Sequence, residues 1–304
     1  MMRQSQSIQA KDGHLIQVFV WPNETAKAWV HINHGMAEHA ERYDDFAQAL
    51  VAAGYAVVAH NHRGHGRTAK QHLGRLAETE SWQSLLDDID EVRFAVCDSR
   101  PYCLFGHSMG SFIVQSYLSQ TEQKVDGLIL CASNFQSPTL SRAGKWVASF
   151  ERWRLGRDQR SALLQFLSFG SFNQAFKPVR TEFDWLSRDN TQVDKYIADP
   201  LCGFPCSSGF WQAFLASLIT LFGTHAIANI QANLAILMIG GTDDPVGMMG
   251  KGLPRLAKAY QQAGQKQLSF KLYEGARHEI LNETNHAEVK QDIINWLAEQ
   301  LAHA

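Results

Sequence analysis

Short apolar runs alternate with helix-compatible stretches along most of this chain. Six such runs, rich in β-branched and aromatic residues, occupy Ala28–Ile32, Ala56–Ala59, Tyr102–Phe105, Gly127–Cys131, Leu234–Ile239 and Leu268–Tyr273. Alternation of this kind predicts an α/β fold, with a mostly parallel central sheet flanked by crossover helices. The earlier run Leu15–Trp21 is followed by Pro22 and Asn23, with no helix before the next strand. We expect that run to form an antiparallel edge hairpin.

Three of the helical stretches carry recognisable end signals. Arg42–Gly54 places its apolar residues on one face and stops at a glycine, which is common just past a helix C-terminus. Ser81–Val96 begins at a residue suited to cap a helix N-terminus. Asn285, with Glu288 three residues later, predicts the start of the last helix.

One connection is too long for a minimal α/β fold. About a hundred residues separate Cys131 from Leu234, whereas a whole βαβ unit needs roughly thirty. Residues 135–222 hold 16 of the 32 aromatic side chains of the chain, which argues against a disordered linker. We therefore expect a catalytic core formed by residues 1–134 and 223–304, with residues 135–222 inserted as a helical cap.

The sequence Gly106-His107-Ser108-Met109-Gly110 follows the run Tyr102–Phe105 and precedes a helix-compatible run. This G-x-S-x-G pattern between a strand and a helix is typical of a nucleophile elbow, in which a serine occupies a sharp turn flanked by glycines. The alternative is a plain strand-to-helix turn. We take Ser108 as the candidate nucleophile.

A serine hydroxyl needs a histidine base and a carboxylate that orients the imidazole. With this elbow, the acid and then the histidine follow the serine along the chain. Asp243 and Asp244 come after the run Leu234–Ile239, and His278 comes after Leu268–Tyr273. We choose Asp244, because Pro245 fixes a turn beyond it and Asp243 could serve as a turn acceptor. The alternative for His278 is a surface histidine near a helix start.

The tetrahedral intermediate of acyl transfer needs two N–H donors at its oxyanion. One is expected from Met109, directly after the nucleophile. The other is expected from Met36, because Asn33-His34-Gly35-Met36 follows the early strand Ala28–Ile32 and Gly35 allows the backbone to approach an acyl group.

Several motifs together resemble the monoacylglycerol lipase and lysophospholipase branch of the α/β-hydrolases. They are His34-Gly35-Met36-Ala37-Glu38-His39 with Arg42-Tyr43, His60-Asn61-His62-Arg63-Gly64-His65-Gly66, Gly106–Gly110, Asp244-Pro245-Val246 and Gly275–His278. The resemblance covers residues 10 to 300 and assigns His34 and His65 to loops that support the oxyanion wall. The family usually has Asp where this chain has Asn61, a departure expected to affect loop structure more than the triad. The segment from Phe183 to Phe204 looks like that of bacterial members of this branch.

This resemblance implies a serine carboxylic-ester hydrolase acting on lipid-like esters of the monoacylglycerol or lysophospholipid type, with no cofactor. Two alternatives remain. An aminopeptidase on the same scaffold would need cap acids such as Asp184, Asp189 or Asp194 to hold a substrate ammonium. A non-catalytic ligand receptor would have little need of a complete triad. A dehalogenase is excluded, because it would need a carboxylate at position 108, where this chain has a serine.

The cap offers two features for a lipid-like substrate. Gly209–Phe222 is the most apolar stretch, too short to span a bilayer, and its Phe210, Trp211 and Phe214 are candidates for lining an acyl pocket. Trp146, Phe150 and Trp153 share a helical face in a segment with six bases (Arg142, Lys145, Arg152, Arg154, Arg157 and Arg160) and two acids (Glu151 and Asp158). This segment is either an interfacial helix that touches lipid or, as we favour, a helix whose apolar face packs on the core.

Composition limits the partners and the compartment. A net charge of −2 disfavours nucleic-acid binding. Five cysteines, an odd and small number, indicate thiols, and without a signal peptide or a long apolar segment we expect a cytoplasmic protein. The six histidines at positions 31, 34, 39, 60, 62 and 65 could suggest a metal site. The carboxylates expected around a catalytic metal are not evident, so no metal is expected. Oligomeric state, acyl-chain length and leaving group stay open.

Overall fold

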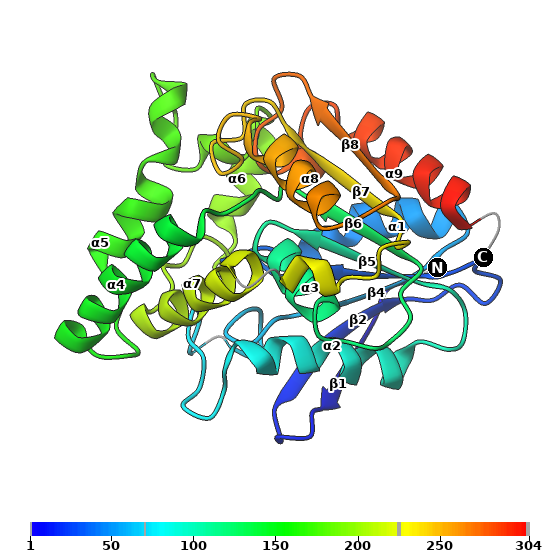
Figure 1. Cartoon of the computed structure of the whole chain (residues 1–304), viewed down its shortest axis with the longest axis horizontal. Coiled ribbons are helices and arrows are strands. Elements are labelled where there is room, and N and C mark those ends of the chain that lie inside the picture. Colours follow the sequence, from blue (N-terminus) through cyan, green and yellow to red (C-terminus); the bar gives the residue numbers. More distant parts are fainter. Residues whose placement is uncertain (1, 70, 224–225, 302–304) are drawn as a thin grey trace.

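A computed structural model describes residues 2–69, 71–223 and 226–301 of the chain. Within them, eight strands form one sheet in the order β1-β2-β4-β3-β5-β6-β7-β8 (Figure 1). The strands are β1 Gln4–Gln9, β2 Leu15–Trp21, β3 Trp29–Asn33, β4 Ala56–His60, β5 Tyr102–His107, β6 Gly127–Cys131, β7 Ile236–Gly241 and β8 Leu268–Tyr273. The main helices are α1 Asp44–Ala52, α2 Trp82–Val96, α3 Met109–Leu118, α4 Pro138–Leu155, α5 Ala162–Gln165, α6 Asn190–Ala198, α7 Ser208–Gly223, α8 Gly252–Gln262 and α9 His286–Leu301.

The sheet is parallel from β4 to β8 and antiparallel at its other side. β3 pairs in parallel with both β4 and β5, so that Trp29 lies between Ala56 and Tyr102. β2 is antiparallel to both β1 and β4. The predicted antiparallel edge hairpin is confirmed: Leu15–Trp21 is β2, and its partner β1 is the outermost strand. The sequence does not predict β1 as a strand, because its segment QSQSIQ is polar at five of six positions and almost wholly exposed.

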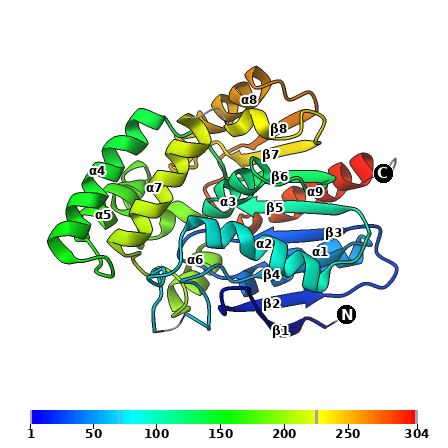
Figure 2. The same cartoon turned by 60° about the horizontal axis from the view of Figure 1, so that its bottom comes forward.

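Helices cover both faces of the sheet. α1 and α9 pack into one apolar layer, and α2, α3 and α8 pack into the other (Figure 2). Alternate residues of β5 feed the two layers: Tyr102 and Leu104 point to one, Cys103 and Phe105 to the other. Both faces of the central strands are therefore buried, as the continuous apolar runs predict.

The segment between β6 and β7 holds α4, α5, α6 and α7 and lies beyond the ends of the parallel strands (Figure 1). α4 and α7 pack side by side, and a Cβ on Gly144 would lie 3.4 Å from Leu215. The aromatic face of α4 does not pack on the core, so that interpretation is wrong: Trp146, Phe150 and Trp153 are 78%, 54% and 80% exposed. The small residues of α4 face α7 instead.

The apolar stretch Gly209–Phe222 forms most of α7. Its large side chains are buried against the sheet layer and the rest of the inserted segment. Among the described residues, no helix is both long and apolar enough to cross a membrane.

Candidate active site

Ser108 stands at a sharp turn between β5 and α3. Its φ of +50° and ψ of −119° are unusual for a residue with a side chain. The two flanking glycines are required, since a Cβ on Gly106 would lie 2.7 Å from the Gly110 carbonyl oxygen, and a Cβ on Gly110 would lie 2.1 Å from that of Asn33. The strained turn exposes the hydroxyl above the end of the strand, as a nucleophile elbow does.

Three side chains from separate loops meet at this turn. Ser108 Oγ lies 2.9 Å from His278 Nε2, and His278 Nδ1 lies 3.0 Å from each carboxylate oxygen of Asp244. Asp244 follows β7 and His278 follows β8, so parallel strands deliver both to one edge of the sheet. Asp243 does not reach the histidine; its carboxylate accepts a hydrogen bond from Thr242.

The electrostatics of His278 suit a base held by a carboxylate. Burial alone would lower the pKa of the imidazole, but the charge of Asp244 and the hydrogen bond to it raise the pKa above its usual value. Asp244 is itself buried and also accepts the backbone N–H of Val246. The carboxylate therefore fixes the ring so that Nε2 faces the serine.

A cavity of about 190 Å³ opens beside Ser108 and His278. Met36 and Met109, the residues expected to supply oxyanion donors, both line it. A Cβ on Gly35 would lie 3.3 Å from that of Ser108 and 2.7 Å from a carboxylate oxygen of Glu38. The loop of Gly35 and Met36 thus approaches the nucleophile closely only because residue 35 is glycine.

The wall of this cavity away from the serine is apolar and comes from the inserted segment. Trp211 and Phe214, two of the predicted pocket residues, line it together with Leu215 and Leu218 of α7. Phe210, the third, does not line it; its side chain is buried with its ring centroid 5.6 Å from that of His65.

A buried ion-pair network lies behind the loop of residues 34–39, which holds the expected oxyanion donor Met36 and which we call the oxyanion loop. Glu38 Oε1 accepts the Gly35 N–H at 2.6 Å and the Tyr43 hydroxyl at 2.8 Å, and Glu38 Oε2 lies 2.5 Å from Arg42. Arg42 also forms two hydrogen bonds, of 2.6 and 2.7 Å, to Glu279, the residue after His278. Burial opposes the charge on Glu38, yet Arg42 holds the pKa of its carboxyl below the usual value. The network ties the oxyanion loop to the loop of the histidine, and sequence reasoning missed it.

Ala37, in the same loop, connects this network to the inserted segment. Its φ is +57°, and its carbonyl accepts hydrogen bonds from the Tyr196 hydroxyl and from the Gly203 N–H, each at 2.9 Å. Its N–H donates to His65 Nε2 at 3.2 Å. The oxyanion loop is thus held from the core and from the inserted segment at once.

The remaining histidines of the sequence motifs are buried; those at positions 34, 60 and 65 form side-chain hydrogen bonds, whereas neither ring nitrogen of His62 has a partner among the described residues. His34 Nε2 accepts the backbone N–H of His62 at 3.0 Å. Burial lowers the pKa of His60 to about 3 and that of His65 to about 4, so these rings are neutral at pH 7. Asn61 accepts the Ala40 N–H and donates to Gln17, as expected of a residue that shapes the loop.

One group of potential metal ligands occurs in the described part of the chain. His39, Asp199 and Cys202 offer ligand atoms within 4.8 Å of one another. His39 Nε2 already lies 2.8 Å from Asp199, and burial raises the pKa of the Cys202 thiol. A protonated thiol is a poor ligand, so the arrangement fits a hydrogen bond between core and inserted segment better than a metal site.

Residues 24–285 match the model of the family described as serine aminopeptidase, S33. The chain belongs to this family. Its relatives include the monoacylglycerol lipase of Mycolicibacterium smegmatis, 27% identical over 98% of both chains, and the human monoglyceride lipase, 27% identical over 96% of this chain and 90% of that protein.

Among solved structures, a highly thermostable carboxyl esterase from Bacillus coagulans, in complex with glycerol, superposes with a TM-score of 0.90 at 26% identity, covering 99% of both chains. The predicted α/β-hydrolase fold is confirmed, and so is the resemblance of this member of the S33 family to the monoacylglycerol lipase branch.

Proposed function

We propose that this protein is a serine carboxylic-ester hydrolase acting on lipid-like esters of the monoacylglycerol or lysophospholipid type. The observation that carries the proposal is the chain of contacts from Ser108 through His278 to Asp244 beside an apolar cavity. Lipase and esterase relatives support an ester as the substrate.

In the proposed mechanism, His278 Nε2 takes the hydroxyl proton as Ser108 Oγ attacks the ester carbonyl. Asp244 stabilises the imidazolium, and the amides of Met36 and Met109 donate to the oxyanion. His278 returns the proton to the leaving alcohol as the C–O bond breaks. Water then attacks the acyl-enzyme, again giving its proton to His278, and the acid is released as Ser108 regains its hydrogen.

Ester hydrolysis is favoured over aminopeptidase activity by the carboxylates near the cavity. An aminopeptidase needs an unpaired acid to hold the ammonium of its substrate. Among the described lining residues, the carboxylates are Glu38 and Glu279, and both are paired with Arg42. The cap acids considered from the sequence are also engaged elsewhere: Asp184 with Thr181, Asp189 with the N-terminus of α6, and Asp194 with Arg180.

The decisive test is hydrolysis of a p-nitrophenyl acyl ester by wild-type protein and by Ser108→Ala. The variant should lose activity and keep its unfolding transition, whereas Ser116→Ala, a buried serine further along α3 and outside the cavity of Ser108, should keep activity. A fluorophosphonate should label wild type and not Ser108→Ala. Retained activity in Ser108→Ala would refute the mechanism, and absence of labelling in wild type would favour the receptor alternative. Ranking monoacylglycerols, lysophospholipids and short esters by kcat/KM then identifies the substrate.

We further propose that residues 135–222 form a cap over the core of residues 1–134 and 223–304, and that α4 touches lipid surfaces. An exposed face of three aromatic rings flanked by arginines and lysine has the character of an interfacial helix. Replacing Trp146, Phe150 and Trp153 by serine should weaken binding to phosphatidylglycerol vesicles, whereas Phe94→Ser, an exposed ring on α2, should not. Equal vesicle binding by the triple variant would contradict this role.

A cytoplasmic location is proposed from the cysteines. All five are free thiols, in keeping with a reducing compartment.

A further inference from the structure

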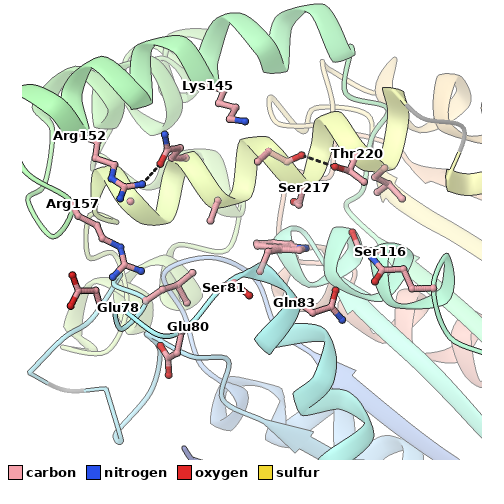
Figure 3. A pocket seen from close by; sticks show the side chains of 18 of the residues that line it. Glu78, Glu80, Ser81, Gln83, Ser116, Lys145, Arg152, Arg157, Ser217 and Thr220 are labelled. Carbon is pink, nitrogen blue, oxygen red and sulfur yellow. Dashed lines mark hydrogen bonds between the residues drawn. The ribbon is translucent and has the colours of Figure 1, made fainter. Parts of the chain in front are cut away.

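A second hollow, of about 760 Å³, lies along α7 (Figure 3). We name it the α4–α7 groove; its lining comes from α4, α7, the end of α3, the start of α2 and the segment before α2. α7 separates the two spaces: Phe214 and Leu218 face the catalytic cavity, while Gln212, Ala213 and Ala216 face the groove. A ligand in the groove would therefore not occupy the acyl site.

Three cationic side chains line this groove: Lys145 and Arg152 on α4, and Arg157 just after it (Figure 3). Within the described residues, none of them has a carboxylate within ion-pair distance. Arg152 donates to the neutral side chain of Gln212, Arg157 donates to the carbonyl of Ala77, and Lys145 has no hydrogen bond to a described residue. The positive charge of the groove is uncompensated along α4.

Two acids also line the groove, and one of them is held by partners outside the groove. The Glu80 carboxylate lies 3.0 Å from His14 and 3.2 Å from Arg63, and accepts the Ala77 N–H at 2.7 Å. Glu78 lies at the end near Arg157 (Figure 3). The stretch beside Lys145 and Arg152 thus has no facing carboxylate among the described residues.

Part of the groove is apolar, although most of its lining side chains are polar. Leu76, Trp82 and Leu221 line it together with the small side chains Ala213 and Ala216, which leave room for an elongated ligand along α7. Its volume lies in the range of small-molecule sites, roughly 300 to 1,000 Å³. An apolar surface beside unpaired cations is complementary to a molecule with an alkyl chain and one anionic end.

We propose that the α4–α7 groove binds a long-chain carboxylate, with its head at Lys145 and Arg152 and its chain along Trp82 and Ala216. The choice of a fatty carboxylate rests on the proposed function, because hydrolysis of a lipid ester releases that chemical class. The catalytic cavity is a poor site for the same anion, since Arg42 is paired with Glu38 and Glu279 there. The groove is then a separate site for the acid product.

The test is isothermal titration of Ser108→Ala, which cannot turn over an ester, with sodium dodecanoate below its micellar concentration at low ionic strength. In the same background, Lys145→Glu with Arg152→Glu should weaken one class of dodecanoate binding at least tenfold, about 1.4 kcal/mol. The control pair, Lys177→Glu with Lys195→Glu, makes the same charge change at exposed cap positions outside the groove and should leave binding within twofold. Circular dichroism melting checks that each variant is folded.

Two further measurements fix the chemistry of the ligand. 1-Dodecanol should bind at least tenfold more weakly than dodecanoate, and raising the salt should weaken dodecanoate binding because the cations are exposed. Equal dodecanoate affinity in the groove variant and the control, or equal affinity for the alcohol and the acid, would overturn the proposal. Ester hydrolysis by wild type is measured separately, so loss of the proposed activity and loss of the groove site give different results.

Discussion

The carboxylate of Glu38 is the part of the site whose removal best tests the network behind the oxyanion loop. Glu38→Gln keeps an oxygen for the Gly35 N–H but turns an amide donor toward the Arg42 guanidinium. A buried hydrogen bond to a charged group contributes about 1.5–3 kcal/mol, and breaking a buried ion pair costs about 3–5 kcal/mol. Because Arg42 keeps Glu279, we expect a loss of about 3 kcal/mol in the free energy of unfolding.

The same change should slow catalysis without weakening substrate binding. Gly35 precedes Met36, so a looser loop misaligns one of the proposed oxyanion donors. Removing such a donor outright costs a factor of about 10² to 10³ in kcat, and misalignment should cost about tenfold with KM unchanged.

Glu41→Gln is the matched control, since Glu41 pairs with Arg3 and Arg67 at the surface, where an ion pair contributes at most about 1 kcal/mol. Urea unfolding and p-nitrophenyl ester kinetics measure both effects. If the two variants shared one unfolding midpoint and one kcat, the reasoning would be refuted.

Two further predictions concern pH. The base must be neutral to accept a proton, so kcat/KM should fall as the pH drops through the pKa of His278, which lies above 6.5. Asp244→Asn should shift this acidic limb of the pH profile to lower pH and should also reduce the rate. An acidic limb that does not move would contradict the assignment of His278 as the base. Stability should also fall in acid. Burial lowers the pKa of His60 to about 3 and those of His65 and His107 to about 4, so the unfolded chain, with pKa near 6.5, binds protons first. Each of these three histidines should lower the free energy of unfolding by about 2 kcal/mol between pH 7 and pH 5, and protonation of His278 should offset part of that loss. Equal urea midpoints at the two pH values would contradict this prediction.

Much of the core could be predicted from the sequence because the residues of its candidate active site directly follow strands. Ser108, Asp244 and His278 each follow an apolar run, and parallel strands carry their carboxyl ends to one edge. The predicted order of the strands is therefore enough to expect these three residues close together. The strand β1 was missed for the opposite reason: its polar residues lie on an exposed edge, and hydrogen bonds to β2 alone decide that it is a strand.

The network of Glu38, Arg42 and Glu279 could not be predicted, although Glu38 and Arg42 belong to the sequence motif that begins at His34. Arg42 and Glu279 are 237 positions apart. Their pairing depends on the loop after β8 folding back beside the loop after β3, which no local pattern encodes.

The inserted segment was harder to read because an apolar stripe on a helix looks the same whether it packs or faces solvent. The rings of Trp146, Phe150 and Trp153 recur at helical spacing, yet the small residues opposite them meet α7. Consecutive helix positions differ by about 100° in direction, so Phe210 points to His65 while Trp211 points to the cavity.

α7 gives the reason why the substrate is harder to deduce than the reaction. One face of this helix lines the cavity of Ser108 and the other lines the α4–α7 groove, so the rotation of the helix determines what each space can hold. That rotation is set by long-range packing, in which Phe214 contacts both Trp82 of α2 and Phe112 of α3. The reacting groups depend on backbone turns that glycines enforce locally. Substrate selection should therefore change with substitutions along α7 that leave the contacts among Ser108, His278 and Asp244 intact.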